Sequence, residues 1–319
     1  MKKTTEIYRS LERKRAVKLI KNGWFHGDPG NGKFEDIKYS FILENSDNNF
    51  YQPIMKHVKE YFKNNNIAWW KGEEPTGHTL SSQISCLNHL FPIRNDKEAV
   101  LSLLHSFTRD FTDVLPIATD KYAPGFISFE QVSDSDLLHE GKPTRGENCT
   151  SIDACIYALH KNGSKWIIPI DWKYAESYSD KDKGSGFSGE TRRKKYDKFI
   201  MKSSQLIYDR MLNSPNCYYY EPFYQLMRQT IWAEQMINHK EKETISADNY
   251  FHLHIVPYKN SDLLEKIYKC SKKNMPATWR GCIIDQSKYK IVSPEILLGG
   301  LGSKYEELTK YLSKRYWDE

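Results

Sequence analysis

Apolar residues at helical spacing dominate the first third of the chain. Residues 6–21 and 52–64 are predicted helices, and residues 81–90 form a third that Pro92 ends. In residues 97–111 the apolar side chains recur every three or four positions, which predicts a fourth helix. This part of the chain is therefore expected to be helical.

From residue 125 the period shortens to that of β-strands. Residues 126–132, 150–159 and 166–172 are predicted strands, and the last is apolar on both faces, as inner strands are. The turn at 161–164 predicts a hairpin between the second and third strands. Pro169 lacks a backbone donor, which predicts a bulge or a sheet edge at that position.

Helices return after a loop rich in glycine and serine. Residues 190–212 predict a basic helix and residues 222–237 an amphipathic one. Residues 250–257 alternate apolar residues with histidines, which predicts a half-buried strand. A strand at 282–291 and a helix at 304–315 are expected to close the chain.

The order helix, three strands, helices, strand predicts an α/β fold. We expect a core at residues 80–260, a helical N-terminal extension at 1–79 and a C-terminal appendage at 261–319. No long linker separates them, so they are expected to form one compact unit.

The composition is that of a folded protein with a basic surface. Among 319 residues, 39% are hydrophobic and 28% charged, and the net charge of +6 favours a polyanionic partner. Six cysteines without a CxxC pair predict reduced, mostly buried thiols. No apolar run suits a secretion signal or a membrane span, so we expect a cytoplasmic protein with no membrane partner.

An acid-x-lysine triplet ends the third predicted strand. Asp171 and Lys173 are two positions apart, so both side chains point to one face, while Trp172 points away and offers its carbonyl to a metal. Pairing within the hairpin brings Asp153 close to Asp171. Two carboxylates suffice for Mg²⁺, and a lysine can position water and stabilise the transition state of phosphodiester hydrolysis. Whether burial lowers the pKa of Lys173 or the acids hold it high stays open.

Two other interpretations of the triplet remain open. Similar triplets occur at 12–14, 36–38 and 140–142, in charged helices or loops. The first interpretation is a strand-end salt bridge that contributes little to stability. A glycosidase with paired carboxylates is the second interpretation, although it gives Lys173 no role and needs no metal.

Asp153 together with residues 170–173 resembles the signature of the PD-(D/E)XK nuclease superfamily. Several blocks are also similar to a bacterial family of restriction endonuclease-like proteins, over roughly residues 78–260. These blocks are residues 81–83 with Asn88 and Pro92, residues 150–154, residues 171–178 and residues 225–229. That family usually has Glu where this chain has Asp171, but the superfamily accepts either carboxylate.

The resemblance implies a restriction endonuclease-like core and hydrolysis of DNA with Mg²⁺ or Mn²⁺. Asp153 and Asp171 would bind the metal, and Lys173 would assist catalysis. The resemblance does not determine which DNA sequence is recognised, whether two protomers pair as a homodimer, or whether cleavage is retained. A catalytically inactive DNA-binding module of the same fold, in a defence or repair complex, is the alternative.

Several other polar residues are candidates for supporting roles. Glu130 is the expected third catalytic acid, with Glu147 as its competitor, and Glu176 is expected to orient the loop after the lysine. Gln225, Arg228 and Gln229 share the polar face of their helix, where they hold water or phosphate or are merely solvated. Ser82 and Gln83 have the same two interpretations, since this segment could simply cap a helix.

A run of four basic residues follows the glycine-rich loop. These residues are Arg192, Arg193, Lys194 and Lys195. They are expected either to contact DNA backbone phosphates close to the cut, because the loop leaves the strand that carries the candidate site, or to form a solvated face. By contrast, His252 and His254 are expected to be structural, and residues 27–33 to form a tight turn rather than a P-loop.

Overall fold

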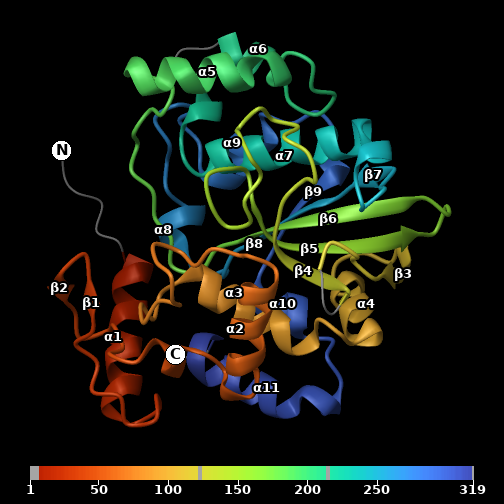
Figure 1. Cartoon of the computed structure of the whole chain (residues 1–319). Coiled ribbons are helices and arrows are strands. Elements are labelled where there is room, and N and C mark those ends of the chain that lie inside the picture. Colours follow the sequence, from red (N-terminus) through yellow and green to blue (C-terminus); the bar gives the residue numbers. More distant parts are fainter. Residues whose placement is uncertain (1–6, 121–123, 213–215, 318–319) are drawn as a thin grey trace.

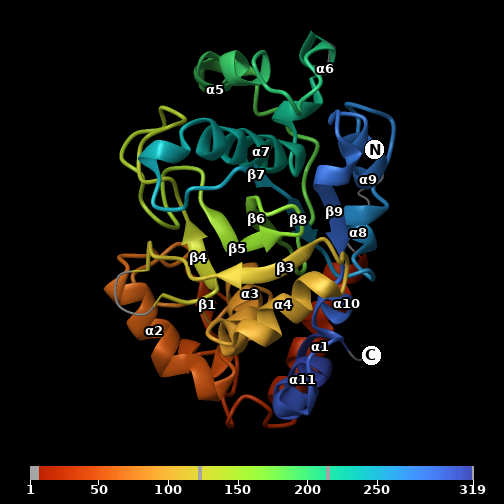
Figure 2. The ribbon, with the colours of Figure 1, turned by 90° about the vertical axis from the view of Figure 1, so that its right-hand side faces the viewer.

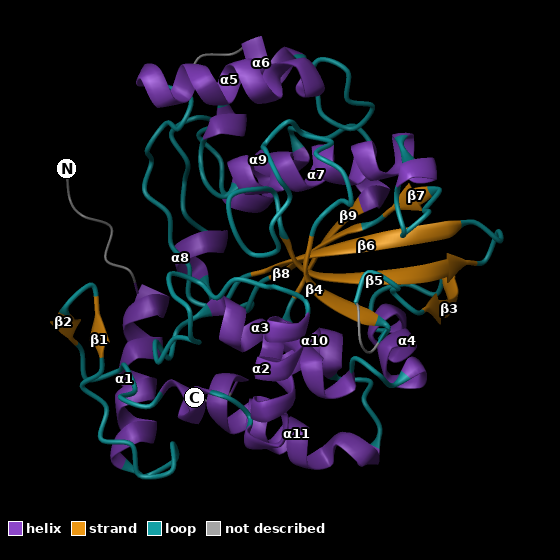
Figure 3. Cartoon of the chain, viewed as in Figure 1, coloured by secondary structure: helices purple, strands orange, loops and turns teal. Residues whose placement is uncertain are grey.

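A mixed β-sheet lies between two layers of helices (Figure 1, Figure 3). In this computed structural model, residues 7–120, 124–212 and 216–317 are described. The strand order is β3–β5–β6–β8–β9, with β4 also beside β5 and β7 beside β6. The strands span Phe111–Leu115 (β3), Ile127–Gln131 (β4), Ile152–His160 (β5), Lys165–Trp172 (β6), Asn249–Tyr250 (β7), His252–Ile255 (β8) and Tyr289–Val292 (β9). The predicted α/β class is confirmed, with an open sheet.

Strands β5 and β6 form the predicted antiparallel hairpin, and β6, β8 and β9 run parallel. The prediction of a bulge or an edge at Pro169 is wrong, because this residue pairs with Cys155 in an unbroken register and β6 is an inner strand. The ladder on the other side of β6 is interrupted between Tyr250 and Leu253, where β7 gives way to β8. The proline therefore lies where the neighbouring ladder has a gap.

One face of the sheet is covered by helices from both ends of the chain (Figure 1). These are α1 (Ile7–Lys21), α2 (Met55–Asn64), α3 (Ser82–Leu90), α4 (Lys97–His105), α10 (Pro294–Leu298) and α11 (Glu306–Leu312). A single buried apolar cluster runs from Tyr8 through the strands to Tyr316. A small hairpin, β1 (Lys33–Phe34) and β2 (Ile37–Lys38), lies beside α1. Both terminal segments thus help to build the core.

The other face is covered by α7 (Phe223–Asn238), and α5 (Gly186–Ile200) lies beyond α7 on the side away from the sheet in both views (Figure 1, Figure 2). The remaining helices are α6 (Asp209–Leu212), α8 (Ser261–Leu264) and α9 (Met275–Arg280). Within the described ranges, none of the helices combines the length and apolarity needed to cross a bilayer.

The predicted helix at 190–212 is wrong in extent, because the structure divides it into α5 and α6. Ser203 and Ser204 donate hydrogen bonds to the Glu234 carboxylate on α7, at 2.6 to 2.8 Å. Leu206 then forms a β-bridge with Ile283. These contacts hold the segment in a non-helical conformation that local propensity does not reveal.

Two other boundaries differ from the prediction. The helix expected at 97–111 ends at His105, since Phe111 instead begins β3 and pairs with His160. The strand expected at 282–291 is restricted to β9, which extends the sheet beyond β8. Pairing with strands distant in sequence decides both boundaries.

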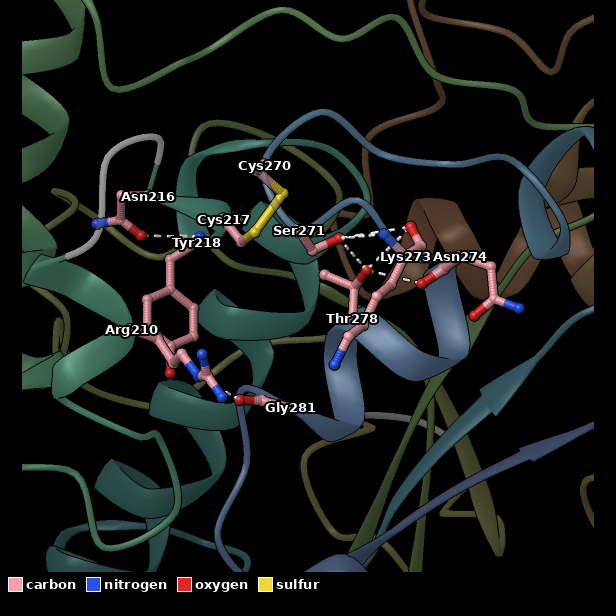
Figure 4. Close-up of a disulfide and its surroundings, with 10 residues drawn as sticks. All are labelled: Arg210, Asn216, Cys217, Tyr218, Cys270, Ser271, Lys273, Asn274, Thr278 and Gly281. Atoms are coloured by element: carbon pink, nitrogen blue, oxygen red, sulfur yellow. Dashed lines mark hydrogen bonds between the residues drawn. A yellow bond between two sulfur atoms is a disulfide. The ribbon is translucent and has the colours of Figure 1, made fainter.

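The prediction that the cysteines are all reduced thiols is wrong, because Cys217 and Cys270 form a disulfide (Figure 4). Their Cα atoms are 5.2 Å apart, within the usual range for such a bond, although 53 residues separate them in sequence. Cys86, Cys155 and Cys282 are buried thiols, and Cys149 is half-buried. The fold brings Cys217 and Cys270 together, and their spacing in the sequence does not reveal this.

Candidate functional site

Asp153 and Asp171 stand opposite each other on β5 and β6. The pair Ala154 and Ile170 is in register, so the next rung of the antiparallel ladder places Asp153 across from Asp171. Oδ2 of Asp153 accepts a hydrogen bond from the backbone N–H of Trp172 at 2.7 Å. The two carboxylates therefore share the face of the sheet that α7 covers.

Lys173 joins Asp171 on this face. Its Nζ atom is 2.8 Å from Oδ1 of Asp171 and 2.8 Å from Oε1 of Gln225 on α7. Burial lowers the pKa of Lys173, but the negative charge of Asp171 outweighs this effect and the net shift is upward. Burial also opposes ionisation of Asp171, yet the Lys173 charge lowers its pKa to about 2. The pair is therefore ionised at neutral pH.

A chain of buried polar groups lies behind Asp171. Nε2 of Gln229 donates to Oδ1 of Asp171 at 2.8 Å, and its Oε1 lies 2.8 Å from Nε2 of His252. Nε2 of His254 is 3.1 Å from Oδ2 of Asp171, but their alignment does not make a hydrogen bond. Nδ1 of His254 is 2.8 Å from the Tyr289 hydroxyl. These contacts fix the Asp171 carboxylate from two neighbouring elements.

Glu130 and Asp153 line a cavity of about 590 Å³. The Glu130 carboxylate accepts hydrogen bonds from Gln83 and Ser151, both at 2.8 Å, and Glu130 has a φ of 49°, in the left-handed region. Its competitor Glu147 is exposed in a turn and does not line this cavity. The structure thus places Glu130, not Glu147, beside Asp153.

The acids on the cavity wall differ in electrostatics from Asp171. Burial raises the pKa of Asp153 to about 8, against the opposing charge of Lys173. Burial also raises the pKa of Glu130, although the hydrogen bonds from Gln83 and Ser151 act in the other direction. A cation near both acids would favour their charged forms.

Two further predicted residues, Trp172 and Glu176, lie where strand alternation and the loop after β6 direct them. The Trp172 ring points to the opposite face, where its Nε1 donates to Ser85 at 3.2 Å. Glu176 lines the cavity and accepts a hydrogen bond from the backbone N–H of Tyr174 at 2.6 Å, so it does orient the loop after Lys173.

Predicted DNA-contacting residues occupy different places. Gln225 lines the cavity, whereas Arg228 forms an ion pair with Glu140 at 3.0 Å and does not line it. Arg192, Arg193, Lys194 and Lys195 lie on α5, which α7 separates from the sheet, and none of them lines the cavity. The expected proximity of the basic run to the site is therefore wrong. The segment between β6 and α5 carries the chain past α7 to the side away from the sheet (Figure 1).

Residues of the N-terminal extension complete the cavity, although the sequence predicted a site built from the core alone. These are Arg9, Phe34, Trp70, Lys71 and His78. They come from α1, the β1–β2 hairpin and the loop before α3. The sequence offers no clear signal for these residues, because the exposure of Trp70 and Lys71 depends on how the extension folds.

The donor atoms suit a hard cation that keeps part of its water shell. Among residues that the structure describes, no three His, Cys, Asp or Glu side chains form a cluster able to hold a metal by themselves. Mg²⁺ needs only one or two carboxylates and retains several waters. Oδ2 of Asp171 is buried and makes no hydrogen bond, although His254 Nε2 lies 3.1 Å away, and such an atom is commonly satisfied by an ion or water. The set therefore fits Mg²⁺ better than a tetrahedral Zn²⁺ site.

Turns and helix caps account for the other motifs. Asp28 accepts hydrogen bonds from the backbone N–H groups of Gly30 and Asn45, both at 2.9 Å. The loop at 28–32 is irregular and leads into β1, so the tight turn predicted over 27–33 ends at Gly27. Ser81 caps α3 through a hydrogen bond from Ile84 N–H, so Gln83 is left to reach Glu130.

Comparison with known proteins identifies the family. No curated protein and no solved structure matches the chain significantly. The sequence profile of a family described as "Restriction Endonuclease associating with ARP" matches residues 10–317, which covers the extension, the sheet and the C-terminal helices. The chain therefore belongs to this restriction endonuclease family, REase-ARP.

Proposed function

We propose that this protein is a Mg²⁺-dependent deoxyribonuclease with a restriction endonuclease-like, PD-(D/E)XK core. The observation that carries the proposal is the meeting of Asp153, Asp171 and Lys173 at the end of the β5–β6 hairpin, beside a cavity that also contains Glu130. Membership in a restriction endonuclease family supports it independently.

Asp153 and Asp171 would hold Mg²⁺ or Mn²⁺, with the Trp172 carbonyl and Glu130 completing the site directly or through water. When bound, the ion would offset the negative charge of the scissile phosphate. Because its pKa is raised, Lys173 stays an ammonium group and acts as a cation and hydrogen-bond donor, not as a base. Gln225 holds that ammonium toward the cavity.

The basic run on α5 would contact DNA at a distance from the cut. Arg193 and Lys194 are exposed, and Arg192 donates to the carbonyl oxygen of Lys183 at 3.0 Å. Backbone phosphates extend well beyond the scissile bond, so a basic helix far from the cavity can still add non-specific affinity.

One observation favours the alternative of a DNA-binding module without catalysis. Asp171 has no exposed surface, and Lys173 and Gln229 already engage its Oδ1 atom. If Asp171 bound a metal ion, its carboxylate would have to interact with that ion and with the Lys173 ammonium at the same time. In either case Asp171→Asn should still bind DNA, but only in an enzyme would it lose cleavage.

The deciding experiment is cleavage of supercoiled and linear DNA with Mg²⁺, Mn²⁺ or EDTA. Asp153→Asn, Lys173→Ala and Glu130→Gln are compared with Glu147→Gln, an exposed acid outside the cavity. We expect metal-dependent cutting that falls at least about 100-fold in the first two variants and is unchanged in the control. Cutting in EDTA, or cutting that survives Lys173→Ala, would refute the proposed metal-dependent site. A glycosidase would leave both DNA substrates uncut, with or without metal. DNA binding without cutting by the wild type would support the inactive module.

A further inference from the structure

One wall of the cavity is made of aromatic rings and cations from the N-terminal extension. The rings of Phe34 and Trp70 are stacked, with centroids 5.4 Å apart and planes inclined by 13°. The Lys71 ammonium lies 4.7 Å from the Phe34 ring and 5.3 Å from the Trp70 ring. Arg9 lines the same cavity, and 42% of Trp70 is exposed. The chain thus keeps a large aromatic surface in contact with solvent beside positive charge.

Backbone geometry holds this wall in place. Glu35 and Asp36 have φ values of 51° and 64°, as in a tight hairpin turn, and they connect β1 to β2 next to Phe34. His78 packs edge-on against Phe34, with centroids 5.5 Å apart. The stacked rings are therefore preorganised.

Gln83 links the aromatic wall to the acids. Its Oε1 accepts a hydrogen bond from the Trp70 backbone N–H at 3.2 Å, and its Nε2 donates to Glu130 at 2.8 Å. One amide group thus spans the distance between the ring-bearing loop and the carboxylate. A ligand with a phosphate at Lys173 and a flat group next to it would reach both walls.

We infer that the Phe34–Trp70 stack binds an unpaired nucleobase of the DNA strand whose phosphate lies at Asp153 and Lys173. This inference rests on the proposed function and deepens it, because it names the form of the substrate. Every base has a flat face that stacks on aromatic rings. Lys71 pairs with the exposed Glu35 carboxylate and would exchange this partner for a neighbouring phosphate. The cavity has the volume of a small-ligand pocket, which suits one nucleotide rather than a duplex. The unpaired base is supplied by a single strand or by a nucleotide extruded from a duplex.

Equilibrium binding without cleavage tests the inference separately from catalysis. Fluorescein-labelled ligands are titrated in EDTA: a 12-nucleotide single strand, its blunt duplex, and an abasic strand of equal length and charge. Trp70→Ala and Phe34→Ala are compared with Trp70→Phe, which keeps a ring. Tyr258→Ala is the matched control, since Tyr258 is 63% exposed and does not line the cavity. Thermal melting verifies that each variant is folded.

For the single strand, we expect Trp70→Ala to weaken binding roughly 5- to 100-fold, with Trp70→Phe and Tyr258→Ala close to the wild type. Binding of the abasic strand should not change. The same loss on the duplex would identify an extruded base as the ligand, and loss on the single strand alone would identify single-stranded DNA. If the wild type binds DNA and folded Trp70→Ala and Phe34→Ala variants bind it equally well, the inference is wrong while the nuclease proposal stands. If the wild type binds no DNA, either in EDTA or with Ca²⁺ in place of Mg²⁺, both fail.

Discussion

The ammonium of Lys173 lies 2.8 Å from Oδ1 of Asp171, and both side chains are almost wholly removed from water. Asp171 lies in β6 and Lys173 follows the last residue of that strand, so the strand alternation, continued by one residue, brings the two side chains together. Removing one partner would leave the other charged and buried, whereas removing both charges would not.

We predict that Lys173→Ala lowers the free energy of unfolding by about 3–5 kcal/mol in addition to abolishing cleavage. The double variant Asp171→Asn with Lys173→Met should regain much of that stability and remain inactive. Urea unfolding of the wild type, Asp171→Asn, Lys173→Met and the double variant forms the cycle. Additive losses of stability would argue against a coupled ion pair.

Gln225 and Arg228 share a face of α7 but should have separate roles. Gln225→Ala removes the hydrogen bond to Lys173 and should reduce cleavage more than stability. Arg228→Ala leaves the Glu140 carboxylate without its charged partner and should cost about 2–3 kcal/mol of stability. Steady-state kinetics and thermal melting of both variants distinguish the catalytic role of Gln225 from the structural role of Arg228. Weaker DNA binding by a fully stable Arg228→Ala variant would contradict this assignment.

Acid should unfold the protein in part through His89. Its Nδ1 is 2.7 Å from the Ser85 carbonyl oxygen and its Nε2 accepts a hydrogen bond from Trp317 Nε1–H, so only the neutral ring satisfies both contacts. Burial lowers the pKa of His89 to about 3, whereas an unfolded histidine has a pKa of about 6.5. The unfolded chain therefore takes up the proton first, and stability is full above pH 6.5 and falls as the pH drops toward 3.

His89→Gln should flatten the pH dependence of unfolding by about 1.4 kcal/mol per pH unit between pH 6 and 4. Part of the slope should remain, because His78, His252 and His254 are also buried with lowered pKa values. Exposed His139 supplies the control substitution His139→Gln. An unchanged slope in His89→Gln would show that this ring is not responsible.

The disulfide should stabilise the layer that contains α7 and α9. Cys217→Ser opens a link between residues 53 positions apart, and the chain-entropy estimate for such a loop is about 4 kcal/mol. The urea midpoint of the wild type should therefore fall with a reductant, and that of Cys217→Ser should not. Cys149→Ser, at a free thiol, should leave the reductant response intact.

Charge on α5 should affect affinity but not the chemical step. Replacing Arg193 and Lys194 with Ala should reduce the salt slope of DNA binding by about one for each phosphate that is no longer neutralised. Single-turnover cleavage at saturating protein should be unchanged, since neither residue lines the cavity. A reduced single-turnover rate would place the basic helix close to the cut.

Local periodicity predicted much of the central sheet and the pairing of the two candidate acids. The hairpin turn and strand alternation determine that Asp153, Asp171 and Lys173 share a face, and both are properties of short segments. The contact of His254 with Asp171 depends on the parallel pairing of β6 with β8. The long segment that connects these two strands has no sequence pattern that predicts this pairing. Likewise, Trp70 reaches the cavity through Gln83 and the fold of the N-terminal extension, which no single segment encodes.

The position of β9 has a practical consequence for any attempt to isolate a minimal catalytic fragment. A fragment ending near residue 260 would turn β8, which carries His254, into an outer strand with unpaired amides and carbonyls along its free edge. Such a fragment should self-associate through that edge, so loss of activity on truncation would reflect aggregation and not a catalytic residue in the deleted part.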